Sequence, residues 1–258
     1  MTLVQPPHRR LTTAEAARAA VREKRAGVDP SERMTPRRIA RAQNVERIKE
    51  LALAQLAASS ASELSLRSIA RELNLVTSAI YRYFAGRDEL ITALILDGYA
   101  DLADTLEAVA GRRSPRRIWL ERCHRLRGWA LDQPHRFALI YGSAIPGYQA
   151  PAETIEPAGR VLLAFCGPAV DGAHDGAHDG RGRRLSGVPR GLTGQLATMR
   201  TGLGLELSDP QALNVCGAFA RVIGLLTLEL NGHLVGSFEP ADQLFTALVE
   251  READLLWP

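Results

Sequence analysis

Apolar residues recur every three or four positions along most of this chain, and this spacing is typical of amphipathic helices. Segments that alternate apolar and polar residues over the length of a strand are nearly absent. Aromatic residues, which favour strands together with β-branched residues, form only 5% of the sequence. The sequence therefore predicts an all-α fold.

Proline, glycine and capping residues indicate where these helices begin and end. Thr35 and Pro36, for example, are of the types preferred at the N-cap and at the first helical position. Asn74 tolerates the left-handed backbone that a tight turn between helices requires. We expect helices over residues 36–58, 66–73, 77–84, 87–110, 115–133, 134–141, 152–165, 210–234 and 240–256.

Residues 167–191 differ from the rest of the chain because they repeat Asp-Gly-Ala-His and then carry several arginines. We predict a flexible loop here, since the repeated glycines disfavour a helix. Histidines four positions apart, with nearby aspartates, leave a metal site as the alternative, but aligning the two imidazoles needs a helix. The residues concerned are His174, His178, Asp171, Asp175 and Asp179. We predict no metal and no cofactor.

Positive charge is concentrated near the amino end of the 258-residue chain. Residues 1–90 hold 16 basic and 10 acidic residues, whereas residues 91–258 hold 16 and 19. Clustered cations favour a polyanionic partner because binding releases counterions from phosphates. Residues 1–33 hold too few large apolar residues for a core, so we expect a mobile basic extension that reaches along DNA; an over-extended start before Met34 is the alternative.

The three cysteines, Cys123, Cys166 and Cys216, are widely spaced and form no C-x-x-C pair. Neither a disulfide framework nor a thiolate zinc site is therefore expected, and a reducing cytoplasm fits best. No apolar run reaches the roughly 18–20 residues that span a bilayer, so we expect no membrane association.

The three helices expected over residues 36–84 form a helix-turn-helix pattern, in which the last short helix enters the major groove of DNA. Residues 66–73 (LRSIAREL) and 78–90 (SAIYRYFAGRDEL) closely resemble the DNA-binding signature of the TetR family of transcriptional regulators. The resemblance implies an all-helical dimer with a larger effector-binding domain, joined to the helix-turn-helix by a long helix. We expect the extension at 1–33, the helix-turn-helix domain at 34–92, and the effector-binding and dimerisation domain at 93–258.

Base recognition requires short or forked side chains on the outer face of this domain. We expect it from Thr77, Ser78, Ala79, Arg82 and Arg67. The family pattern places Tyr81, Tyr83 and Arg87 against phosphates; a buried Tyr81 and a solvated Arg87 are the alternatives. Apolar packing between the two short helices is expected from Ile69, Leu73, Ile80 and Phe84.

The chain departs from the family pattern at Asn74 and Val76, where Gly and Ser are frequent. The loss of Ser removes an expected helix cap, and we expect Thr77 to replace that cap by shifting the helix start by one residue.

Residues 126–148 resemble the branch of the family whose effector domain is called the WHG type, with Trp129, His135 and Gly142 in those places. Aromatic residues with a polar tip suit an effector pocket. We therefore predict that Trp129, Tyr141 and Tyr148 bind a small-molecule effector, with core packing as the alternative. His135, beside Pro134, is expected to hold a turn.

Residues 224–234 resemble the penultimate helix, which many family members use to dimerise. Small residues would allow close helix approach, and the two last helices would pair with their symmetry mates in a four-helix interface. Burial inside one subunit is the alternative. The predicted dimer residues are Gly217, Ala218, Arg221, Gly224, Leu225 and Leu228, with apolar area from Phe219, Ile223, Leu226 and Leu230.

The sequence thus predicts a ligand-responsive DNA-binding regulator, a repressor that a small molecule releases from a palindromic operator. A helical metal- or ligand-binding interaction module without sequence-specific DNA binding is the alternative. An enzyme is not expected: Cys123 and His124 are neighbours on a helix and point about 100° apart, and we find no nucleophile elbow, P-loop or zinc-protease motif.

Overall fold

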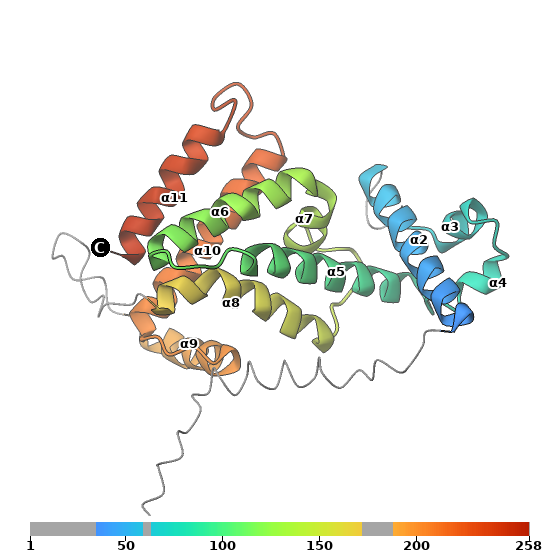
Figure 1. The fold of residues 1–258 in the computed structure, drawn as a ribbon, viewed down its shortest axis with the longest axis horizontal. Helices are drawn as coiled ribbons and strands as arrows, with labels where there is room; N and C mark the ends of the chain where they lie inside the picture. Colours follow the sequence, from blue (N-terminus) through green and yellow to red (C-terminus); the bar gives the residue numbers. More distant parts are fainter. Residues whose placement is uncertain (1–34, 59–62, 172–187, 258) are drawn as a thin grey trace, which may run out of the picture. The chain divides into compact units, whose positions relative to one another are not determined.

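The computed structural model describes residues 35–58, 63–171 and 188–257, and every regular element in these ranges is a helix (Figure 1). The prediction of an all-α fold is confirmed. The predicted extension at 1–33 and most of the predicted loop at 167–191 lie outside the described residues. The chain divides into two units, Met1–Asn44 and Val45–Pro258, and each is described by itself.

Helix α2 (Pro36–Ala58) has the predicted bounds. Its start lies in the first unit, where the Thr35 hydroxyl accepts a hydrogen bond from the backbone N–H of Arg38 (3.3 Å). This bond satisfies one of the N–H groups that a helix start leaves without a partner. Thr35 is therefore the N-cap, as predicted.

The second unit contains the two short helices α3 (Leu66–Glu72) and α4 (Thr77–Ile80) and the long helix α5 (Arg87–Glu107). Ser65 caps α3, because its hydroxyl accepts from the Ser68 N–H (3.3 Å). Asn74 has a φ of 54°, which confirms the predicted left-handed turn. These helices enclose a small apolar core. It contains Ile48, Ala52, Leu64, Leu66, Ile69, Ala70, Ile80, Phe84, Leu90, Ile91, Leu94 and Ile95.

Both short helices end earlier than predicted, α3 by one residue and α4 at Ile80 instead of Phe84. Beyond α4 the backbone tightens: Arg82 N–H donates to Ala79 O (3.1 Å) and Tyr83 N–H to Ile80 O (2.9 Å). These i to i−3 bonds close a tighter turn than an α-helix. The segment from Thr77 to Phe84 is thus one α-helical turn followed by 3₁₀-like turns.

The cap expected from Thr77 is absent, because α4 begins at Thr77 itself with the exposed residue Val76 in the N-cap position. Val76 has no side-chain oxygen to accept from the first N–H groups. We expect Val76→Ser to stabilise the protein by about 0.5–2 kcal/mol, the range for N-cap substitutions. Urea denaturation followed by circular dichroism would measure it. Val76→Ala is the control, since it shortens the side chain without adding an acceptor, and equal stability of the two variants would contradict the argument.

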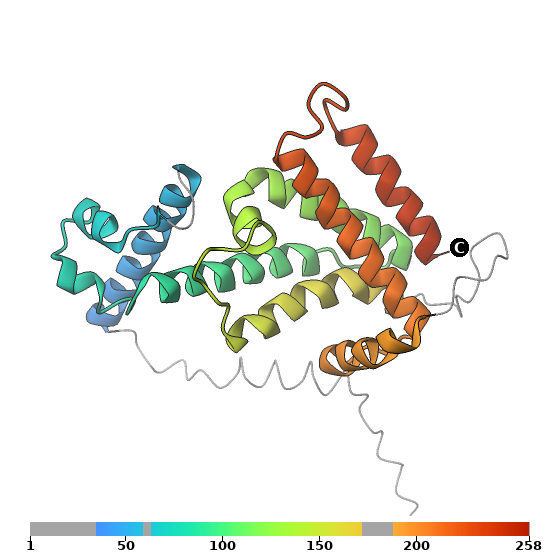
Figure 2. The ribbon, with the colours of Figure 1, turned by 180° about the vertical axis from the view of Figure 1, so that it is seen from behind.

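The remaining helices surround a second and larger core. They are α6 (Pro115–Asp132), α7 (Pro134–Tyr141), the 3₁₀ turn η2 (Ala152–Thr154), α8 (Ile155–Asp171), α9 (Arg190–Leu203), α10 (Asp209–Leu230) and α11 (Asp242–Leu256). Figure 2 shows α10 and α11, orange-red and red, packed side by side. The core between these helices is rich in aromatic residues, with Trp119, Phe165 and Phe245 fully buried.

Both ends of the predicted loop at 167–191 are helical, since α8 continues through Asp171 and α9 begins at Arg190. Pro168 lacks an N–H, so it cannot bond the Ala164 carbonyl four residues earlier. The Arg122 guanidinium from α6 donates to that carbonyl instead, and also to Val109 O (3.1 Å). Tertiary hydrogen bonding thus supports a helix that local sequence rules would end. Helix α9 was not predicted.

Other helix ends also differ from the prediction. Helix α10 ends at Leu230 instead of 234, and α11 begins at Asp242 instead of 240. Gly232 and Gly236 have positive φ angles of 74° and 77°. Positive φ is costly for other residues, so these glycines allow the turns that separate the two helices.

Candidate DNA interface and effector domain

The helix-turn-helix surface exposes most of the side chains predicted to touch DNA. Arg67, Thr77, Ser78 and Arg82 are exposed, whereas Ala79 is half-buried. Tyr81 is 47% exposed, so the alternative of a buried Tyr81 is wrong. The outer face of α4 and the turn after it therefore present hydroxyl, phenol and guanidinium groups together. Whether these groups contact bases or phosphates remains a prediction.

Tyr83 and Arg87 are half-buried at the junction between the short helices and α5. The ring of Tyr83 packs against the helix-turn-helix core, so this residue contributes to packing as well as offering a hydroxyl. Arg87 lies 3.6 Å from the Asp88 carboxylate. Glu89, also in the first turn of α5, accepts from the Ala85 N–H, which places acids where the helix dipole favours them.

Four apolar residues were predicted to fix the angle between the short helices. Ile69, Ile80 and Phe84 are buried and Leu73 is half-buried, all in the same core. This packing prediction is confirmed. An ion pair adds to it: Lys49 of α2 lies 2.8 Å from Asp97 of α5. The shared core and this ion pair therefore hold α2, α3 and α4 on α5, so a displacement of α5 would displace α4.

Tyr148, predicted to bind an effector, lies against the start of α5. Its hydroxyl lies 2.9 Å from the hydroxyl of Thr92, a buried residue that donates to Asp88 O (2.9 Å). The Tyr148 ring packs against the helix-turn-helix core together with Leu139 and Ile145. The loop after α7 thus contacts α5 and the helix-turn-helix core.

Trp129, a second predicted effector residue, is buried and its indole N–H donates to Asp101 of α5 (2.9 Å). Arg136 of α7 donates to the same carboxylate oxygen (3.3 Å). Asp101 therefore joins three helices, α5, α6 and α7. The hydrogen bond gives Trp129 a structural role, which is the alternative that the sequence left open.

Tyr141 lies in the aromatic part of the larger core. Its ring centroid lies 5.4 Å from that of Phe137, 6.1 Å from Phe219 and 6.2 Å from Tyr99. Burial, and to a lesser degree Tyr99, raises the pKa of Tyr141 well above its usual value. The phenol therefore stays neutral. Of the three predicted effector residues, only Tyr141 lies mainly among aromatic rings.

The other two positions of the Trp-His-Gly pattern have different roles. His135 is exposed in the first turn of α7, just after Gln133, and its predicted role in holding the turn stays a prediction. Gly142 ends α7, and a Cβ there would lie 2.2 Å from Ala138 O. No side chain fits without a backbone shift.

We expect Gly142→Ala to destabilise the protein by about 1–3 kcal/mol, the usual cost of overpacking. Thermal unfolding of the variant and of Gly128→Ala would measure this. Gly128 is exposed inside α6 with open space around its Cβ position, so alanine there is expected to be neutral or stabilising. A Gly142→Ala protein as stable as the parent would contradict the collision.

The predicted dimer residues on α10 fall into three groups, which are fully buried, partly buried and exposed in one chain. Ala218 and Leu226 are fully buried inside the larger core, so they cannot contribute surface to an interface, and the prediction is wrong for these two. Phe219, Ile223, Leu225 and Leu230 are partly buried against that core. Gly224 and Leu228 are exposed, and Leu228 is 46% accessible. The groups follow the helical period of α10. Residues on the face toward α6 and α8 pack inside the subunit, and residues on the opposite face stay exposed.

Arg221 bridges α10 and α11 on the outer side, through an ion pair with Glu252 (2.5 Å). Its guanidinium lies over Gly217, where a Cβ would come within 3.2 Å of Nη1. The space at Gly217 is thus used by Arg221 of the same chain, not left open for a close helix approach as predicted.

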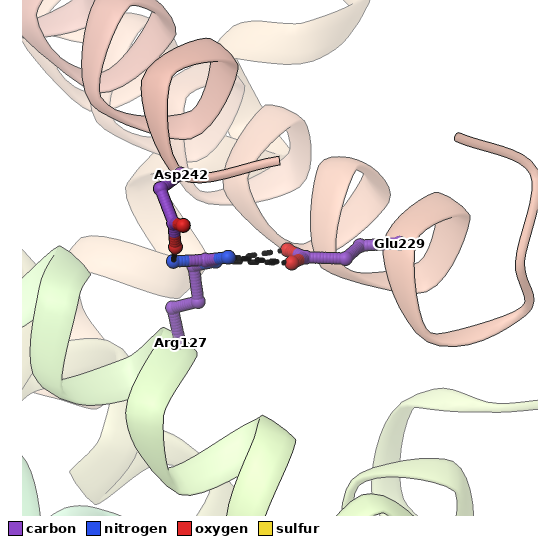
Figure 3. Close-up of polar contacts among 3 residues, drawn as sticks. All are labelled: Arg127, Glu229 and Asp242. Atoms are coloured by element: carbon purple, nitrogen blue, oxygen red, sulfur yellow. Dashed lines mark hydrogen bonds and ion pairs between the residues drawn. The ribbon is translucent and has the colours of Figure 1, made fainter. Parts of the chain in front are cut away.

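Arg127 of α6 makes a dense set of polar contacts with α10 and α11 (Figure 3). Its Nε donates to Glu229 Oε2 (2.9 Å), its Nη2 to Glu229 Oε1 (2.6 Å), and its Nη1 to Asp242 Oδ1 (2.5 Å). The guanidinium also lies 5.4 Å from the Phe245 ring centroid. The hydrogen bonds to Glu229 chiefly raise the pKa of Arg127.

Among the described residues, Cys123 and His124, the neighbouring pair considered for catalysis, differ in burial. Cys123 is fully buried, and burial raises its pKa well above the usual value. The neighbouring residue His124 is exposed and makes an edge-to-face contact with Phe245, with ring centroids 5.5 Å apart. Within 35–58, 63–171 and 188–257, no three His, Cys, Asp or Glu side chains are grouped to hold a metal ion. His174 and His178 lie outside these ranges.

Sequence reasoning missed Arg127, Asp101, Thr92 and Arg122. Each makes its key contact with another helix or, for Thr92, with the loop after α7, so its partner is distant in sequence: Arg127 and Glu229 are 102 positions apart. A half-buried arginine leaves no local pattern that distinguishes it from a solvated one. Around these four residues, helical periodicity predicted the apolar core positions but not the polar contacts.

Two family models match the chain. Residues 48–94 match the model described as bacterial regulatory proteins, tetR family, and residues 119–251 match the model described as tetracyclin repressor-like, C-terminal domain. The second match spans the region that resembles the WHG type. That branch assignment remains a prediction.

Curated relatives include the HTH-type transcriptional regulators Rv1816 of Mycobacterium tuberculosis H37Rv and Mb1846 of Mycobacterium bovis. Each is 39% identical over 207 residues, which cover 78% of this chain and 86% of the relative. The crystal structure of SCO4313 has 34% identity and a TM-score of 0.67, covering 87% of this chain and 100% of that chain. A tetR-family regulator from Streptomyces coelicolor, at 20% identity and a TM-score of 0.55, shares the fold over 83% of this chain and 80% of its own.

Proposed function

Because this chain belongs to the TetR family of DNA-binding transcriptional regulators, which is not a class of enzymes, we propose that it is a homodimeric repressor. In this proposal a small molecule binds the larger domain and releases the dimer from a palindromic operator. The observation that supports it most directly is the exposed row of polar side chains on and after α4, held on a rigid core. Membership of a family of DNA-binding regulators argues against the alternative of an interaction module without DNA binding.

The proposed DNA contacts are those predicted from the sequence. Thr77, Ser78, Ala79, Arg82 and Arg67 would read bases, and Tyr81, Tyr83 and Arg87 would bind phosphates. Their exposure, or half-burial at the end of the core, supports this assignment. The proposed domains are the helix-turn-helix at 34–92 and the effector domain at 93–258, with the basic extension at 1–33.

The proposed dimer face is the outer side of α10 and α11. Its large exposed apolar residues are Leu213, Leu228, Leu248 and Leu255. Among the described helices, α10 alone is long and apolar enough to cross a membrane, with a mean hydropathy of 1.5, yet only 22% of that stretch is buried in one chain. Pairing with a second subunit would cover the exposed leucines of α10 and α11. We accordingly assign α10 to a subunit interface of a cytoplasmic protein.

The effector is proposed to bind near Tyr141, where aromatic rings from α5, α7, α8 and α10 meet. Trp129 and Tyr148 are assigned to the contacts between this domain and α5. A ligand shifts the protein between two states only as far as its affinity for them differs, and α5 connects the domains, so the coupling passes through α5.

Selection of bound fragments from the source organism's genomic DNA would test the proposal. We expect enrichment of a pseudo-palindrome whose half-sites lie one helical turn, about 34–36 Å, or a multiple apart, and binding by a species of dimeric mass. A monomer in solution, or a selection that enriches no common sequence, would overturn it.

A further inference from the structure

Helix α6 holds two polar contacts that point to opposite sides. Arg127 and Trp129 are two positions apart, which on an α-helix is a rotation of about 200°. The Arg127 side bonds Glu229 of α10 and Asp242 of α11, and the Trp129 side bonds Asp101 of α5. One rigid helix thus contacts both the proposed dimer helices and the helix that carries the DNA-reading domain.

The contacts of Arg127 define both the position and the orientation of α10 and α11 relative to α6. Its guanidinium forms a two-pronged pair with Glu229 and a further bond to Asp242, and it lies over the Phe245 ring in a cation–π contact. The Arg127 and Glu229 side chains are only 14% and 13% exposed, so solvent screens the pair little. A planar fork bound this way permits one geometry, whereas a lysine ammonium would permit many. Arg127 therefore fixes α10 and α11 against α6.

The contact at Trp129 continues this constraint to α5. Asp101 accepts from the Trp129 indole and from Arg136 of α7, so α5 is tied to two helices at this point. Arg87 lies 14 residues earlier on α5, about 21 Å along the axis. A tilt of about 5° at Asp101 would move the start of α5 by about 2 Å over that length. Small changes at α6 are therefore enlarged at the DNA-reading end.

We propose that α6 transmits the geometry of the dimer helices to the two DNA-reading domains, and that Arg127 is the positioning residue that sets the distance between them. The proposal rests on the dimeric operator binding put forward above. It predicts a specific defect: loss of Arg127 relaxes the required half-site spacing, whereas contacts within each half-site are unchanged.

The test uses the full-length protein and the palindrome selected by the parent. Two further DNAs have one base pair added to or removed from the centre, and a fourth holds a single half-site. Dissociation constants are compared for the parent, Arg127→Met and Arg116→Met. Arg116 is a matched control, because it also joins α6 to α11 through an ion pair, with Asp254 (2.6 Å), but both side chains are more exposed.

We expect Arg127→Met to lower the preference for the correct spacing by about tenfold, with half-site binding unchanged and Arg116→Met like the parent. Equal weakening on all four DNAs, or an unchanged preference, would overturn the role of Arg127. If Arg127→Met is not a folded dimer by circular dichroism and light scattering, Glu229→Gln decides, since it keeps the shape and removes the charge. Failure of the parent to select a palindrome would instead refute the proposed function, and this inference with it.

Discussion

Replacing Leu228 with Glu is expected to separate the dimer into monomers. Leu228 lies on the exposed face of α10 and is 46% accessible in one chain. In a two-fold interface the substitution occurs twice, so each subunit loses apolar burial and gains a carboxylate that must leave water without a partner. We expect the dissociation constant of the dimer to rise by at least about 100-fold, which corresponds to about 2.7 kcal/mol. Sedimentation equilibrium over a range of concentrations would measure it.

Leu131→Glu is the matched control for this experiment. Leu131 is 43% exposed at the end of α6 and lies outside the proposed dimer face. Leu131→Glu therefore makes the same substitution, with the same added charge, at a residue nearly as exposed as Leu228. We expect this variant to remain dimeric and to bind the operator like the parent. Dissociation of both variants alike would show that an added carboxylate, and not the place of Leu228, is responsible.

Replacing Arg82 with Ala is expected to cause the largest loss of operator affinity among the predicted DNA contacts. A forked guanidinium on guanine contributes about 1–3 kcal/mol of discrimination at its base pair, and the dimer loses that contact in both half-sites. Affinity for the selected operator should therefore fall at least about tenfold, and the preference at one base position per half-site should be lost. Titration of operator variants at fixed salt concentration would measure both effects.

Arg71→Ala controls for the loss of positive charge. Arg71 is an exposed residue in the last turn of α3, one helix away, and is not among the predicted base contacts. We expect a small loss that is equal for all sequences, with a weaker dependence on salt. If Arg71→Ala and Arg82→Ala had the same effect on every operator variant, Arg82 would be a general electrostatic contact and the assignment to base reading would be wrong.

The sequence predicted features that depend on neighbours along the chain. Thr35 caps its helix as expected, Asn74 takes the left-handed turn, and the apolar residues Ile69, Ile80 and Phe84 form the small core. These features could be predicted because caps, turns and helical periodicity involve residues within about four positions of each other.

Predictions failed where a distant part of the chain supplied the deciding contact. Helix α8 continues past Gly167 because Arg122 bonds the carbonyl that Pro168 leaves without its helical partner. Ala218 was predicted to face a second subunit, but the surrounding helices bury it. The sequence shows that α10 has apolar residues all round, and it cannot show which of them face the subunit's own core.

The sequence by itself determined that this chain is helical and that it resembles one family of DNA-binding regulators, because these properties lie in local spacing and in a contiguous motif. Only the tertiary structure decided that Trp129 and Tyr148 hydrogen-bond α5, that Arg127 holds α10 and α11, and which face of α10 stays exposed. The physical reason is that side-chain pairing across helices depends on the angles at which the helices pack. Those angles are set by many weak contacts throughout the chain.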